Sequence, residues 1–138
     1  MTQAENLVVG IDLGTTNSLV ARVVNGKPEI VKDASGERIF VPSVVSFLDD
    51  GTPLVGKTAR ERASTAPRRT VHSIKRLMGK GLSDVSENDR ALLPYELAEV
   101  ERKLVRVKIG ERALTPQEVS ALILRELKTR AEAGLGRE

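Results

Sequence analysis

Leu7-Val8-Val9-Gly10-Ile11-Asp12-Leu13-Gly14-Thr15-Thr16-Asn17-Ser18 is the stretch that decides the fold of this 138-residue chain. It opens with an almost unbroken apolar run over residues 7–11, which is too short for a helix and rich in valine. Such a run predicts a strand that is buried on both faces. The turn that follows leads into a second expected strand over residues 18–24, and Asn25-Gly26 predicts a hairpin after it.

The turn between these two strands has the composition of an anion-binding loop. Glycine followed by small hydroxyl residues lets the backbone turn sharply, so that amide groups converge on one point. Asp12, just before the turn, could hold a magnesium ion directly or through water against phosphate oxygens. The competing interpretation is a hairpin turn in which Asp12 and the threonines satisfy only local backbone groups. The residues of this stretch leave both interpretations open.

A second phosphate-binding pattern occurs at Gly51–Thr58, which satisfies G-x-x-x-x-G-K-T in full. It would make Lys57 a ligand of the β- and γ-phosphates and Thr58 a magnesium ligand. Against this, Pro53 removes an amide donor, and the two bulky apolar residues after it stand where phosphates should lie. A hairpin over residues 43–55 explains the same sequence better, and a P-loop NTPase stays as the weaker alternative.

The composition excludes several classes of function. Lysine and arginine exceed aspartate and glutamate by only 22 to 19, and three aromatic residues are too few for a base-stacking surface, so nucleic acid is not an expected partner. Without cysteine the chain offers no thiolate ligands. No apolar run approaches membrane-spanning length, and the polar start of the chain lacks a signal pattern, so we expect a cytoplasmic protein. The single histidine, His72, has no second ligand near it and is expected to pack or face solvent.

The stretch over residues 56–78 has helical tendency, interrupted at Pro67, and is basic. Such a run is usually a solvated helix face. A different class of function remains open, a non-enzymatic interaction module that uses Arg60–Arg76 as its surface. The cations of this run are Arg60, Arg62, Arg68, Arg69, Lys75 and Arg76.

The last third predicts a strand pair over residues 95–109, a short strand at 112–114 and a helix. Thr115 can cap that helix, Pro116 suits its first position, and Glu118 completes a capping box. One apolar stripe indicates a core-facing side, and glycines at 134 and 136 end the helix. The stripe consists of Val119, Leu122, Ile123 and Leu127.

Gly10–Ser18 resembles the first phosphate loop of the Hsp70 chaperones. The resemblance continues in order through residues 41–45, 54–56, 74–79 and 115–121, and it covers about residues 7–136. It implies an α/β fold, the first lobe of an actin-like, ribonuclease-H-like ATPase domain, with β-hairpins and a C-terminal amphipathic helix. Residues 1–138 would then be an incomplete N-terminal part of a nucleotide-binding domain, with no substrate-binding domain.

The resemblance also implies a site for ATP or ADP with Mg²⁺. Asp12 would hold the magnesium ion through water, and the phosphates would lie on Gly14, Thr15, Thr16 and Asn17. Lys75 would reach the γ-phosphate and the attacking water. Asp12 and Lys75 are thus the expected catalytic residues, and because the second lobe is missing we expect no ATP hydrolysis by this chain alone.

In the full-length family the implied partners are unfolded polypeptides, a J-domain co-chaperone and a nucleotide exchange factor. Leu19, Met78 and Leu93-Pro94-Tyr95 are similar to the branch that serves iron–sulfur cluster assembly. In the resembled topology, the strand at residues 7–11 pairs on its far side with a strand that follows the helix. We therefore expect an open strand edge, partial exposure of the helix stripe, and self-association.

Overall fold

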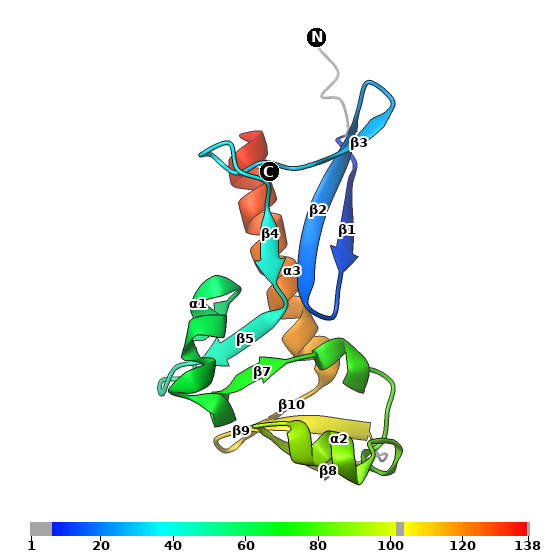
Figure 1. Ribbon diagram of the computed structural model, residues 1–138, viewed down its shortest axis with the longest axis vertical. Helices are drawn as coiled ribbons and strands as arrows, with labels where there is room; N and C mark the ends of the chain where they lie inside the picture. Colours follow the sequence, from blue (N-terminus) through cyan, green and yellow to red (C-terminus); the bar gives the residue numbers. More distant parts are fainter. Residues whose placement is uncertain (1–6, 102–103, 138) are drawn as a thin grey trace.

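A computed structural model describes residues 7–101 and 104–137. Three small sheets, all antiparallel, pack around one long helix, α3 (Pro116–Leu135), which starts near the third sheet and ends beside the first (Figure 1). The first sheet contains β1 (Val9–Leu13), β2 (Asn17–Val24), β3 (Lys27–Ile30) and β4 (Phe40–Pro42). The second contains β5 (Val44–Phe47), β6 (Pro53–Val55) and β7 (Thr70–His72), and the third β8 (Glu96–Val100), β9 (Leu104–Ile109) and β10 (Arg112–Leu114).

The predicted hairpin at the start of the chain is confirmed. β1 and β2 pair with Leu13 opposite Ser18, and the connecting loop begins at Gly14. Asn25 and Gly26 both adopt positive φ and turn β2 into β3, as the sequence predicts. β2 is the inner strand of this sheet, because β1 pairs with one of its edges while β3 and β4 share the other.

The prediction that the first strand is buried on both faces is wrong for this chain. Val9 is 38% exposed and Ile11 is 44% exposed. The reason is topological, since β1 pairs with β2 alone and its other edge has no strand partner within the described residues. The expected open edge is therefore confirmed.

The helical tendency of residues 56–78 is realised only in part. A five-residue helix, α1 (Lys57–Glu61), is followed by the 3₁₀ turns η1 (Arg62–Ser64) and η2 (Pro67–Arg69), the strand β7, and a further 3₁₀ turn, η3 (Ile74–Leu77). The helical path is interrupted just before Pro67, as expected, and Pro67 begins η2. The strand was missed because its three residues gain their structure from pairing with β5, Val45 lying opposite Val71, and not from local sequence preference.

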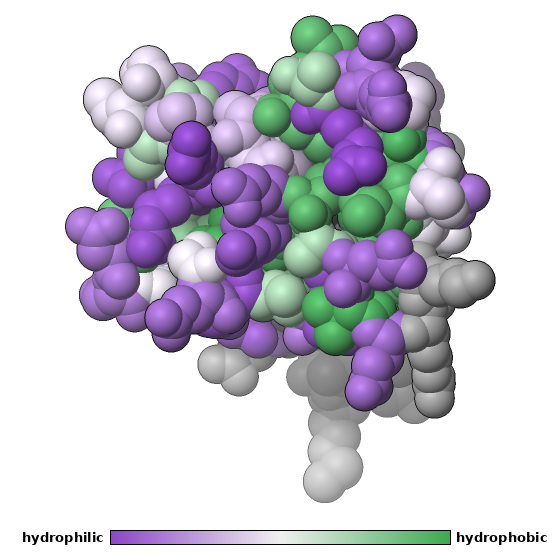
Figure 2. Space-filling model, turned by 90° about the horizontal axis from the view of Figure 1, so that it is seen from below, coloured by the Kyte–Doolittle hydropathy of each residue, from purple (hydrophilic) through white to green (hydrophobic). Residues whose placement is uncertain are grey.

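The third sheet confirms the strand pair expected over residues 95–109, and β10 adds the short strand expected after it. Between η3 and this sheet the chain forms η4 (Leu82–Asp84) and α2 (Glu87–Leu92). Figure 2 views this end of the molecule and shows apolar side chains gathered among polar ones. The large apolar residues that α2, β8 and β9 leave exposed are Leu92, Val100 and Leu104.

Helix α3 begins as the sequence predicts. The Glu118 N–H donates to Thr115 Oγ1 at 3.1 Å, and the Thr115 N–H donates to Glu118 Oε2 at 2.7 Å. Gly136, in the left-handed conformation, ends the helix, while Gly134 lies inside its last turn and not beyond it.

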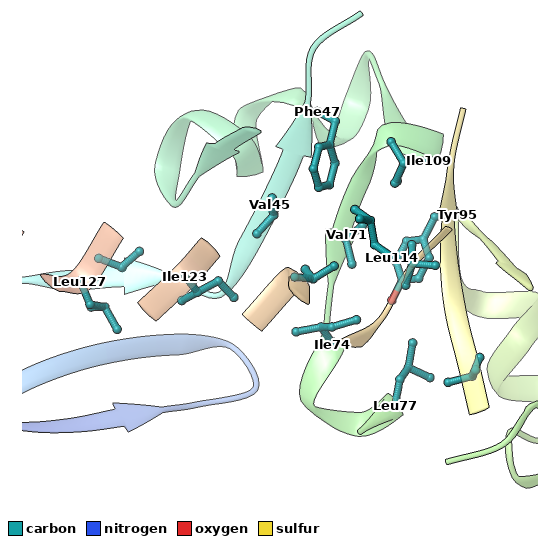
Figure 3. Packing of buried hydrophobic residues seen from close by; sticks show 14 of the residues in the cluster. Val45, Phe47, Val71, Ile74, Leu77, Tyr95, Ile109, Leu114, Ile123 and Leu127 are labelled. Carbon is teal, nitrogen blue, oxygen red and sulfur yellow. The ribbon is translucent and has the colours of Figure 1, made fainter. Parts of the chain in front are cut away.

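The apolar stripe of α3 is better buried than expected. Val119, Ile123 and Leu127 are each 0% exposed, and only Leu122 is partly accessible. In Figure 3, Ile123 and Leu127 point into the core that strand β5 shares, while Val71, Ile74 and Leu114 continue the same cluster toward the third sheet. The expected exposure of this stripe is wrong, because β2, β5, β6, β9 and η3 cover the helix without any further strand.

Candidate functional site

The candidate site is built on the loop that joins β1 to β2. Gly14 opens the loop, and a Cβ atom built on it would lie 2.1 Å from the carbonyl oxygen of Asn17, closer than real atoms approach. Only glycine therefore permits this tight loop. Within residues 7–101 and 104–137, no hydrogen bond uses the backbone N–H of Thr15 or Thr16. The loop thus presents two unused donors at its tip.

Ser43, between β4 and β5, braces the loop from the side. Its backbone N–H donates to the Thr16 carbonyl at 2.9 Å, and its hydroxyl donates to the Gly14 carbonyl at 2.8 Å. Because that donation uses the only hydroxyl proton of Ser43, the 2.8 Å contact between the two serine hydroxyls is a donation from Ser18 Oγ to Ser43 Oγ. Ser18 is 0% exposed and Ser43 is 2% exposed.

A surface hollow of about 470 Å³ lies against the loop. Several of its lining residues carry hydroxyl groups, and the lining contains one cation and no carboxylate. A hollow of this composition suits an anion, because neutral donors and a cation converge on it while nothing repels negative charge. Its lining consists of Thr15, Thr16, Asn17, Ser43, Val44, Arg60, Ala63, His72 and Ser73.

The cation of this hollow, Arg60, comes from helix α1. Its Nη2 donates to Asn17 Oδ1 at 3.2 Å and links the helix to the phosphate loop. Two other arginines of the basic run are also held, since Arg62 Nε donates to Ser46 Oγ at 3.1 Å and Arg69 Nη1 donates to the Leu48 carbonyl at 3.0 Å. The run is therefore not one continuous helix face, and three of its arginines make hydrogen bonds within the fold.

His72 lies at the border of the hollow and packs, as expected. Its ring meets that of Tyr95 edge to face with 5.8 Å between the centroids. Burial lowers the pKa of His72, and the charge of Arg76 lowers it further, so the ring is neutral at pH 7. Tyr95 donates its hydroxyl to the His72 carbonyl at 2.7 Å, and burial raises the pKa of Tyr95 to about 12.

The structure places the remaining expected residues around the hollow and not in its lining. Asp12 stands on β1 opposite Leu19, exposed, and its carboxylate makes no hydrogen bond or ion pair within the described residues. Lys75 is exposed in η3, two residues after Ser73, which lines the hollow. Ser73 has a φ of 55°, so the backbone turns sharply just before the lysine.

The second phosphate-binding pattern folds as a hairpin, which contradicts the P-loop alternative. The segment from Gly51 to Thr58 contains strand β6, paired with β5, and then enters α1. Gly56, with a φ of 88°, makes the corner between strand and helix and does not cradle an anion. Lys57 is the first residue of that short helix and is exposed.

Residues 7–101 and 104–137 contain neither a metal-ligand cluster nor a helix that could span a membrane. No three histidine or acidic side chains stand close enough together to hold a metal ion as a cluster. No helix there is both long and apolar enough to cross a membrane.

Sequence reasoning missed Ser18, Ser43 and Arg60 as parts of the site. Ser43 is 29 residues from Gly14 and Arg60 is 43 residues from Asn17, so neither partnership leaves a local pattern in the sequence. The one available signal was Pro42, which breaks the strand beside Ser43 and brings that serine to the loop.

The comparisons with known proteins agree with this architecture. A family model described as "Hsp70 protein" matches residues 8–138. The chain is 48% identical over 132 residues to a protein named "Chaperone protein HscA homolog" from Azotobacter vinelandii (strain DJ / ATCC BAA-1303), covering 96% of this chain and 21% of that protein. A protein of the same name from Burkholderia orbicola (strain MC0-3) is 46% identical over the same share of each chain. The chain therefore spans about a fifth of the length of these relatives.

Proposed function

Because this chain belongs to the Hsp70 family, we propose that it forms the ATP-binding first lobe of a chaperone that couples ATP hydrolysis to protein folding. The observation that carries the proposal is the tight loop at Gly14. Thr15 and Thr16, whose amide donors are unused, line a hollow that contains a cation and no carboxylate. Such a loop is suited to phosphate oxygens.

The residues present fit a nucleotide with magnesium. The amides and hydroxyls of Thr15 and Thr16, with Asn17, would hold phosphates, and the unpaired carboxylate of Asp12 would hold the hydrated ion. Mg²⁺, when bound, neutralises charge on the β- and γ-phosphate oxygens. Lys75 would hold the γ-phosphate and orient the attacking water. The chain's own part in phosphoryl transfer is therefore positioning and charge neutralisation.

An isolated lobe leaves that site open on one side. Enclosure by a second lobe strengthens the electrostatic stabilisation of the transition state, because it excludes water from the reacting groups. We therefore propose that the 138-residue chain alone does not hydrolyse ATP. An actin-like continuation of the fold, beyond the share of the relatives that this chain spans, would complete the site.

The wider role belongs to the same proposal. A complete protein of this kind would act on unfolded polypeptides in the cytoplasm, with a J-domain co-chaperone and a nucleotide exchange factor. Leu19, Met78 and Leu93-Pro94-Tyr95 support the branch that serves iron–sulfur cluster assembly. Within this chain, Tyr95 packs against His72, which lines the hollow, so one of these branch residues contacts the lining of the candidate site.

The test compares two lysines in an enclosed site. The chain is grafted in place of the matching residues of the Azotobacter vinelandii relative, and single-turnover ATP hydrolysis is measured for Lys75→Ala and Lys57→Ala. We expect Lys75→Ala to lower the rate by about 10²-fold or more, as loss of a positioned charge does, and Lys57→Ala to leave it unchanged. Loss with Lys57→Ala alone would overturn the assignment.

The isolated chain provides a second test. Purified 138-residue protein is assayed with MgATP, and Asp12→Asn is the matched control. We expect no turnover by either protein. Magnesium-dependent turnover that disappears in Asp12→Asn would show that one lobe is sufficient for hydrolysis.

A further inference from the structure

We propose that Ser43 is a positioning residue that locks the phosphate loop in its anion-binding conformation, an inference that rests on the proposed function. Ser43 contacts the loop at two points, one on each side of Thr15. It comes from the junction of β4 and β5, between the first and second sheets, so a residue outside the β1–β2 hairpin holds the loop.

The two contacts divide the polar groups of the loop into two sets. Ser43 takes up the carbonyls of Gly14 and Thr16, through its hydroxyl at 2.8 Å and its N–H at 2.9 Å. The N–H groups of Thr15 and Thr16 are left without partners in the described part of the chain. With its carbonyls engaged by Ser43, the loop can offer donors to an anion, and carbonyl oxygens, which would repel phosphate, are kept occupied.

Burial makes this arrangement rigid. Ser18 and Ser43 are at most 2% exposed, so water cannot replace the hydrogen bonds between their hydroxyls and the loop. Ser18 donates to Ser43 at 2.8 Å, which commits the Ser43 proton to the Gly14 carbonyl. The two serines form one directional chain of hydrogen bonds that ends on the loop.

Strand β5 supplies a matched control. Ser46 is 0% exposed, and its hydroxyl accepts from Arg62 Nε and lies 2.9 Å from Thr70 Oγ1, but it makes no hydrogen bond with the phosphate loop. Ser46→Ala therefore removes a buried serine hydroxyl at similar general cost without touching the site. Ser43→Thr keeps the hydroxyl and tests rescue.

The first experiment measures the loop in the 138-residue chain itself, without nucleotide. The amide of residue 43 still donates to the Thr16 carbonyl when Ser43 is changed to alanine, so its hydrogen-exchange protection reports loop closure. We expect Ser43→Ala to lower this protection about tenfold and to lower the order parameters of Thr15 and Thr16. Ser46→Ala and Ser43→Thr should both stay close to the wild-type values.

The second experiment measures nucleotide in the graft described above. We expect Ser43→Ala to raise the KM for MgATP about tenfold with a smaller change in kcat, and Ser43→Thr to restore it. An active graft in which Ser43→Ala and Ser46→Ala behave alike would overturn the role of Ser43. An inactive wild-type graft would instead contradict the proposed function and leave the hydrogen-exchange result to decide about Ser43.

A variant that fails to fold does not end the test. Ser18→Ala removes the donor to Ser43 but keeps both contacts between Ser43 and the loop. We expect it to lower protection at residue 43 by about twofold to threefold, less than the loss of Ser43 itself. No change in Ser18→Ala, together with an unfolded Ser43→Ala, would assign Ser43 to folding alone and overturn the proposal.

Discussion

Strand β1 and helix α3 both carry apolar residues, but those of β1 are much more exposed to solvent than those of α3. Along α3, Ile123 and Leu127 are 0% exposed, whereas on β1 Ile11 remains 44% exposed. The helix is surrounded by elements from all three sheets, while the strand has one neighbour in its sheet. The apolar character of a segment therefore indicates what it can bury, and the partners present in the chain decide what it does bury.

The difference also appears in the space between them. A hollow of about 460 Å³ lies between β1 and the C-terminal half of α3, and Val9, Ile11, Ala131 and Leu135 contribute to its lining. This part of the first sheet is thus the least complete region of the core, although it carries the phosphate loop.

The largest effect that this comparison predicts is a difference in the free energy of unfolding between two alanine substitutions, one on α3 and one on β1. Leu127→Ala should lower the free energy of unfolding by about 2–5 kcal/mol, because it leaves a cavity in a closed core. Ile11→Ala should cost about 1 kcal/mol or less, since its side chain already meets water. Urea unfolding followed by circular dichroism measures both. Equal costs would show that β1 is covered in solution.

The second prediction concerns the open edge of β1. We expect the isolated chain to self-associate by pairing this edge with that of a second copy, because residues 7–11 are apolar and carry no charge or proline that would block strand pairing. Val9→Lys places a charge on the edge strand and should shift the chain to monomer in sedimentation velocity runs.

Val23→Lys is the control for this prediction. Val23 is 69% exposed, but it lies on the inner strand β2, where it pairs with Pro28 of β3 and follows Arg22, the last residue of β2 that pairs with β1. The same substitution there adds the same charge without blocking an edge, so association should persist. If both variants become monomeric, general charge repulsion explains the effect. If the wild-type chain is already monomeric, the edge is closed in another way.

Much of the fold could be predicted from the sequence, because the deciding signals are local. The Asn25-Gly26 turn, the Thr115 capping box and the hairpin around Gly51 each depend on residues a few positions apart. Strand β7 could not be predicted, because its structure comes from pairing with β5 some 26 residues earlier, as Val45 pairs with Val71. The burial of β1 was predicted wrongly for the same reason, since it depends on a neighbour and not on the strand.

The candidate site also combines residues that local sequence signals predict with residues that only long-range contacts bring in. The loop residues Gly14 to Asn17 form a local pattern that the sequence shows directly. Ser43 and Arg60 reach that loop only through the folding of β5 and α1, so no spacing in the sequence predicts their hydrogen bonds. The roles of Asp12 and Lys75 stay predictions, because both side chains are exposed and neither residue lines the hollow.

A smaller effect is expected at the start of α3, where stability comes from a cap and not from the core. Thr115→Ala removes the acceptor for the Glu118 N–H and should lower the free energy of unfolding by about 1 kcal/mol. Thr115→Ser keeps the acceptor and serves as the control. A loss as large as that of Leu127→Ala would mean that the cap, and not burial, dominates the stability of the helix.

The smallest expected effect is the pH dependence that Glu118 adds to this cap. The backbone N–H of Thr115 donates to the Glu118 carboxylate and lowers its pKa below the ordinary value of 4.5, with help from the Thr115 hydroxyl and from Arg106 and Arg112. Because the pKa is lower in the folded than in the unfolded state, the carboxylate stabilises the fold fully above the unfolded value, and this stabilisation is lost as pH falls through the folded value. Glu118→Gln keeps the shape of the side chain without the charge, so the gap between wild type and variant should be constant near pH 7 and should close between pH 4.5 and more acid values. Thermal unfolding of both proteins across this range measures the gap. A gap that stays constant down to the lowest pH would show that the ionised carboxylate of Glu118 does not stabilise the cap.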